Sequence, residues 1–127
     1  MDNVAGLADF STILELVYRY CQGLHQGNSA DLRQLFHQDC VLKSPGNRRS
    51  MEEWLAAVDS RPVPASSGAP FKFRLLSVEV YGDQAMVKLE CPLFDYFYID
   101  YLGLLYEQDR WRIVNKMYTD DCKPLEQ

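Results

Sequence analysis

Histidine is scarce in this chain, and its few cysteines are scattered. The two histidines, His25 and His37, share no metal-ligand spacing with each other or with any cysteine. No C-x-x-C pair occurs among the four cysteines, which are Cys21, Cys40, Cys91 and Cys122. The sequence therefore predicts no metal site and suggests no cofactor. The cysteines are expected to be reduced and mostly buried, behaving as small apolar residues.

Positive charge is also in short supply. Lysine and arginine number 13 against 18 acidic residues, for a net charge of −5. A nucleic-acid-binding protein needs a basic patch to neutralise phosphates, so we expect no nucleic-acid partner. Two small basic clusters, Lys43 with Arg48 and Arg49 and Arg110 with Arg112, are expected on solvated surface.

Long apolar runs are missing as well. No stretch approaches the length of a membrane span, and the acidic N-terminus lacks the apolar core of a signal peptide. These observations predict a cytoplasmic protein with no membrane partner. The 127 residues, 47% of them apolar, are enough for one domain with a real core, and residues 1–127 are predicted to form it.

The first half of the chain carries helical patterns. Apolar residues from Phe10 to Leu24 recur at helical spacing, and Gly27-Asn28 then ends the pattern. Asn28 is expected to cap a short second helix that ends near residues 37–39, before a brief strand at 40–42. Ser50-Met51-Glu52-Glu53 is a capping box that opens a third helix.

The second half carries strand patterns. A loop rich in proline and serine at 61–70 is followed by four runs, near 71–80, 85–91, 94–105 and 111–117. In the first run the alternation changes phase between Leu75 and Leu76, which predicts a β-bulge and a bent sheet. Pro92 is expected to interrupt the second run. Three helices and then a bent antiparallel meander predict an α+β domain, with a concave pocket between helices and sheet.

The run from Phe94 to Tyr101 is rich in aromatic residues and holds a carboxylate. Both of its faces are apolar. One face is therefore expected to pack on the core, and the other to be covered by another layer such as a partner subunit. Asp100 shares its face with Tyr96 and Tyr98. A carboxylate among rings must be hydrogen-bonded, paired with a charge or protonated, which makes Asp100 the first candidate for chemistry.

Four segments together resemble the cone-shaped superfamily named after nuclear transport factor 2, which includes SnoaL-like cyclases and ketosteroid isomerase. They are residues 20–28, 35–39, 100–102 and 111–116, and they span nearly the whole chain in the right order. Within that superfamily the chain is most similar to the lumazine-binding branch of uncharacterised bacterial proteins. The resemblance implies three N-terminal helices packed on a strongly curved, mainly antiparallel sheet. It says less about activity, because this fold hosts unrelated chemistries.

Ketosteroid isomerase offers one specific comparison. Its catalytic tyrosine falls on Tyr20 and its protonated aspartic acid on Asp100, which in that enzyme form the oxyanion hole, a known example of a carboxylic acid kept neutral. Its carboxylate base falls on Ser44, before Pro45. A serine cannot remove a proton from carbon at neutral pH without an activating base. The resemblance thus implies hydrogen-bond donors without the base, and it argues against steroid isomerisation.

Each candidate residue also has a purely structural interpretation. Asp100 is either a proton-sharing donor to a ligand or a structural carboxylate bonded to a tyrosine or a helix end. Tyr20 is either its partner at the site or a core tyrosine. His37 either acts on a ligand or satisfies the last carbonyls of the second helix.

The sequence thus predicts a small-molecule-binding protein with an enclosed, mostly apolar pocket. Its ligand is expected to be small and apolar or aromatic, and the protein a homodimer through the outer sheet face. A cofactor-free lyase, isomerase or cyclase acting on a carbonyl compound is the first alternative, and a non-catalytic dimerisation module the second. Whether the chain is an enzyme stays open, with Tyr20, Asp100 and His37 as catalytic candidates. The predicted pocket residues are Tyr20, His37, Trp54, Tyr96, Tyr98, Asp100 and Asn115.

Overall fold

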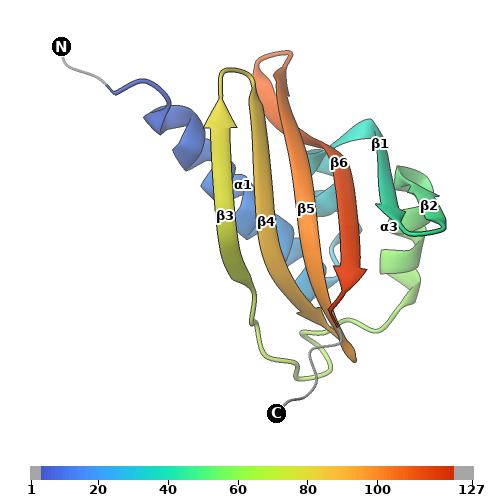
Figure 1. The fold of residues 1–127 in the computed structure, drawn as a ribbon. Coiled ribbons are helices and arrows are strands. Elements are labelled where there is room, and N and C mark those ends of the chain that lie inside the picture. Colours follow the sequence, from blue (N-terminus) through green and yellow to red (C-terminus); the bar gives the residue numbers. More distant parts are fainter. Residues whose placement is uncertain (1–3, 122–127) are drawn as a thin grey trace.

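Three helices cover one face of a curved six-stranded sheet (Figure 1). The structure is a computed structural model and describes residues 4–121. The helices are α1 (Leu7–Gln26), α2 (Ser29–Leu35) and α3 (Met51–Ser60). The strands are β1 (Phe36–Ser44), β2 (Asn47–Ser50), β3 (Arg74–Tyr81), β4 (Gln84–Leu93), β5 (Tyr96–Glu107) and β6 (Arg110–Asp120). The predicted α+β class and its three helices on a bent sheet are confirmed.

The sheet has the strand order β2-β1-β6-β5-β4-β3. The last four strands of the chain form the expected antiparallel meander. The parallel pair is β1 with β6, which lets the first half of the chain join the meander at its edge. The sheet is therefore mixed but mainly antiparallel, and it curves around the helices (Figure 1).

Helix α1 packs most of its predicted apolar stripe into the core, with Ile13 and Tyr20 fully buried, but Phe10 at the start of the stripe is exposed. It ends at Gly27, whose φ of 61° lies in the left-handed region that favours glycine. A second glycine, Gly23, lets α2 approach closely. A Cβ at Gly23 would lie 2.7 Å from the Leu32 side chain, so a larger residue could not be accommodated without movement.

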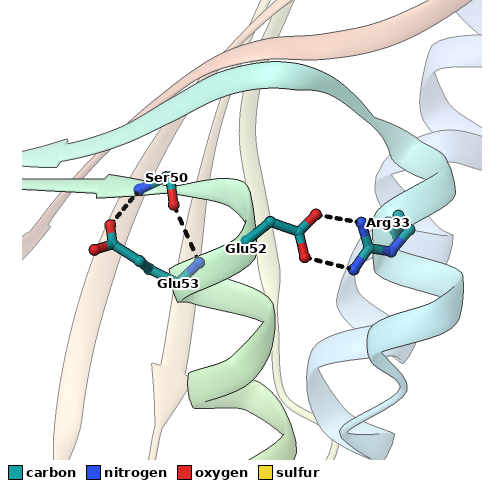
Figure 2. Close-up of polar contacts among 4 residues, drawn as sticks. All are labelled: Arg33, Ser50, Glu52 and Glu53. Atoms are coloured by element: carbon teal, nitrogen blue, oxygen red, sulfur yellow. Dashed lines mark hydrogen bonds and ion pairs between the residues drawn. The ribbon is translucent and has the colours of Figure 1, made fainter.

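The start of α3 is fixed by the predicted capping box. The Glu53 backbone N–H donates to Ser50 Oγ, and the Ser50 backbone N–H donates to Glu53 Oε1 (Figure 2). A neighbouring bidentate ion pair, from Arg33 on α2 to Glu52 on α3, links the two helices (Figure 2). Because both of its side chains are largely exposed, this pair contributes little to stability.

Several predicted boundaries were wrong. Helix α2 ends at Leu35, and residues 37–39 lie in β1 rather than at a helix end, so His37 does not satisfy helix carbonyls. Strand β2 was not predicted, and β3 begins only at Arg74. Pro92 lies within β4, beyond Glu90, where the paired part of β3 has already ended. A proline is tolerated there because the strand needs hydrogen bonds on one side only.

Besides a shift between Phe36 and Val41 in the pairing of β1 with β6, two register shifts shape the inner face of the sheet. The predicted bulge in β3 is present, between Leu75 and Ser77. A second, unpredicted shift lies in β6. There Gly103 pairs with Asn115 but Leu104 pairs with Ile113, which leaves Val114 as the extra residue. Since a bulge reverses the alternation beyond it, residues after Val114 face the opposite way from the simple pattern.

The core lies between the helices and the inner face of the sheet. On β5 this face carries Asp100, Leu102 and Leu104, which are at most 2% exposed. Phe97, Ile99 and Tyr101 on the opposite face are only half-buried. Across residues 4–121, no helix has both the length and the apolar character needed to cross a membrane.

Candidate functional site

Tyr20 and Asp100 meet inside the core. The Tyr20 hydroxyl, on α1, donates a hydrogen bond of 2.6 Å to Asp100 Oδ2, on β5. Tyr20 is 0% exposed and Asp100 2%. Such burial of a polar pair is costly unless the groups satisfy one another, and this hydrogen bond does so.

Burial and the nearby carboxylate also keep the tyrosine protonated. The pKa of Tyr20 is raised well above its usual value, chiefly by desolvation and then by the negative charge of Asp100. The phenol is therefore a donor, and its proton points to Asp100. The arrangement differs in this respect from the two-donor oxyanion hole of ketosteroid isomerase, in which both groups donate to the ligand.

Lys116 is the third member of this buried cluster, and it was not among the residues predicted for the site. Its Nζ lies 3.7 Å from Asp100 Oδ2, and the residue is 7% exposed. The ammonium also lies over three aromatic rings, 4.7 Å from the ring centroid of Trp54, 5.3 Å from that of Tyr20 and 5.6 Å from that of Tyr118. Carboxylate and ring faces together offset the cost of burying the cation.

The bulge at Val114 explains why Lys116 was missed. Plain alternation places Asn115 on the face of Trp111 and Ile113. The register shift turns Lys116 inward instead and leaves Asn115 on the other face. There the Asn115 side-chain oxygen accepts a hydrogen bond of 2.6 Å from Lys43 Nζ.

A cavity of about 90 Å³ borders this cluster. It is small beside the roughly 300–1,000 Å³ of pockets for drug-sized ligands. Three predicted pocket residues line it: Trp54, Tyr98 and Asp100. The other lining residues are Leu24, Arg49, Arg61, Cys91, Leu93, Lys116 and Tyr118.

The remaining predicted residues lie elsewhere. Tyr20 does not line the cavity but is bonded to Asp100, which does. Tyr96 stacks on Tyr98 with ring centroids 5.2 Å apart, and it is 50% exposed. His37 lies in a separate surface depression, with its Nδ1 2.6 Å from an Asp39 carboxylate oxygen.

Two arginines at the cavity were also missed. Arg49, expected on solvated surface, is half-buried at the wall, whereas its neighbour Arg48 is exposed as expected. Arg61 follows the end of α3, where the sequence suggested only a loop. No local pattern marks either residue, because β2 and the path of the chain after α3 bring them to the site.

Acidic side chains are few at the cavity. Among residues 4–121, Asp100 is the one carboxylate in the lining, and no histidine borders it. Ser44, which takes the place of the isomerase base, is not in the lining either. Over the same residues, no cluster of three or more His, Cys, Asp or Glu side chains could hold a metal ion. Within the described residues, the lining thus contains no second carboxylate and no imidazole beside Asp100.

The sequence profile of one family, described as "Putative lumazine-binding", matches residues 8–119. This match covers most of the chain. The chain belongs to this family. A comparison with curated proteins finds no match.

Solved structures described as nuclear transport factor 2-like proteins have a fold similar to that of this chain. A protein of this type and of unknown function from Silicibacter pomeroyi is 22% identical, with a TM-score of 0.73, covering 92% of this chain and 99% of its own. Another from Shewanella baltica is 17% identical, with a TM-score of 0.78 and coverage of 92% and 97%. A protein of unknown function from the DUF3225 family of Pectobacterium atrosepticum is 22% identical, with a TM-score of 0.69 and coverage of 90% and 91%. At these identities the likeness shows the fold.

Proposed function

We propose that this protein binds a small, largely apolar or aromatic molecule in the cavity beside Asp100 and leaves it chemically unchanged. The observation that carries the proposal is the buried cluster of Tyr20, Asp100 and Lys116 at the cavity wall. Apolar side chains of similar size would fill this part of the core at lower cost. A few convergent polar groups beside an apolar wall are typical of ligand sites.

Each part of the cluster has a role in this proposal. Asp100 accepts a hydrogen bond from the ligand, while Tyr20 and Lys116 hold the carboxylate in place. Trp54 and Tyr98 provide ring faces for a flat molecule. The family description names lumazine, a flat heterocycle, and is one more reason to begin with such compounds.

The test is a thermal-shift screen of small aromatic compounds, lumazine among them, followed by recovery of each hit. A bound ligand raises the melting temperature by mass action. Asp100→Asn should weaken the hits at least tenfold, and Tyr20→Phe should weaken them to a smaller extent. The matched control is Tyr106→Phe, which removes a half-exposed phenol at the far end of β5 and should bind every hit as wild type does. Unchanged binding in both site variants would refute the proposed anchor, and a hit recovered as product would favour the catalytic alternative.

Self-association through the outer face of the sheet is the second part of the proposal. Met86 and Met117 on this face are 48% and 45% exposed, and Tyr101, which lies opposite Met117, is half-buried. An apolar surface of this kind is typical of a subunit interface.

The described cysteines Cys21, Cys40 and Cys91 form no disulfide, which suits the reducing conditions of the cytoplasm.

A further inference from the structure

The cavity has more positive than negative side chains. Its lining includes Arg49, Arg61 and Lys116, but among residues 4–121 Asp100 is its one carboxylate. Lys116 lies beside Asp100, so these two charges offset each other. Two guanidinium groups then remain at the wall, in a protein whose net charge is −5.

Arg61 is the more informative of the two arginines. Its Nη2 is buried and has no hydrogen-bond partner within the described part of the chain. Its side chain also lies over the Phe94 ring, with Cζ 5.4 Å from the ring centroid, so one side of the guanidinium is covered by an apolar group. A buried donor without a partner is costly and calls for an explanation, such as a ligand that completes it.

The neighbouring arginine adds to that cost. The pKa of Arg61 is lowered, first by desolvation and also by the positive charge of Arg49. Repulsion between two partly buried cations is relieved when an anion lies between them. Guanidinium groups suit this task, because their planar N–H donors match the two oxygens of a carboxylate.

The rest of the lining limits what that anion can be. Trp54, Tyr98 and Tyr118 contribute aromatic rings, and the volume is about 90 Å³. We propose that the ligand is a small aromatic carboxylate, with its carboxylate bound by Arg49 and Arg61 and its ring against Trp54 and Tyr98. This inference rests on the proposed binding function and specifies the charge of the ligand.

Matched pairs of acid and amide test the charge at constant shape. The probes are 3-hydroxybenzoate with 3-hydroxybenzamide and 5-hydroxynicotinate with 5-hydroxynicotinamide. In each pair the ring hydroxyl can donate to Asp100 and only the acid or amide group differs, and each compound is titrated at constant ionic strength while the melting temperature is followed. The acids should bind about tenfold or more tightly than their amides. Arg61→Gln should abolish this preference. Arg48→Gln, which removes the same charge from an exposed position on β2, should keep it.

A second measurement needs no ligand. In a Trp111→Phe background, Trp54 is the remaining tryptophan, and it lines the cavity. An anion-attracting cavity should let iodide quench its fluorescence several-fold more strongly than caesium. Arg61→Gln should reduce quenching by iodide, and Arg48→Gln should not.

The outcomes separate this inference from the proposed function. If the amides bind as tightly as the acids, or if the acids bind Arg61→Gln unchanged, the anion inference is overturned while small-molecule binding stands. If none of the four probes binds and caesium quenches Trp54 as well as iodide does, the anion inference is also overturned. Failure of every compound in the wider screen, neutral ones included, would instead refute the proposed function.

Discussion

The hydrogen bond between Tyr20 and Asp100 permits a quantitative prediction. Tyr20→Phe keeps the ring and removes only the hydroxyl that donates over 2.6 Å to Asp100 Oδ2. A hydrogen bond to a charged group contributes about 1.5–3 kcal/mol, and a buried acceptor that loses its donor is costly. Both partners are buried, so solvent cannot replace the lost donor. We expect the free energy of unfolding to fall by about 2–3 kcal/mol.

Asp100→Asn should also be destabilising, for a different reason. It leaves the Lys116 ammonium, 7% exposed, without its carboxylate. Breaking a buried ion pair costs about 3–5 kcal/mol. The distance of 3.7 Å and the three surrounding rings should reduce this to about 2–3 kcal/mol.

A double-mutant cycle isolates the interaction between the two side chains. The double variant Tyr20→Phe/Asp100→Asn should be less destabilised than the sum of the single variants, by about 1–2 kcal/mol. Urea unfolding at neutral pH, followed by tryptophan fluorescence, measures each free energy. Tyr106→Phe is the control and should change stability by less than about 0.5 kcal/mol, because it is 43% exposed. Additive single effects, or no loss in Tyr20→Phe, would refute the cluster as described.

Three further predictions concern the thiols, the helix contact and the oligomer. Burial raises the pKa of the Cys21 thiol from 9.0 to about 12, so its contribution to stability is complete below about pH 9 and is lost as the pH rises toward 12. Urea titrations between about pH 9 and 11 should therefore show the free energy of unfolding falling more steeply with pH in wild type than in Cys21→Ala, by about 1.4 kcal/mol per pH unit. An equal dependence on pH in the two proteins would contradict this. Gly23→Ala should lower stability by about 1–3 kcal/mol despite the better helix propensity of alanine, because the new Cβ would lie 2.7 Å from the buried Leu32 side chain. A rise in melting temperature would instead show that α2 can move away. Sedimentation should give a dimer that Met117→Lys dissociates, and a stable species of 14.7 kDa for wild type would count against the proposed interface.

The three helices and the antiparallel meander of the last four strands could largely be predicted from local sequence. The capping box at Ser50, the stop at Gly27 and the phase change at Leu75 are short-range signals, and each lies in the structure where the pattern indicated. The contact between Tyr20 and Asp100 also followed from sequence, through the resemblance to ketosteroid isomerase. The end of α2 did not follow, because the parallel pairing of β1 with β6 begins at Phe36 and overrides the weak helical signal there.

The amino-acid sequence by itself determined where the three helices begin, that both faces of β5 are largely apolar, and that a carboxylate lies among rings. These features follow from the apolar periodicities of two residues in a strand and 3.6 residues in a helix, which can be read from residues close together in the sequence. Only the tertiary structure decided which charges share the cavity. Lys116 faces inward because pairing with β5 places a bulge at Val114, and Arg49 and Arg61 reach the same wall from separate elements. Strand register and chain path depend on contacts between segments far apart in sequence, so no local pattern carries them.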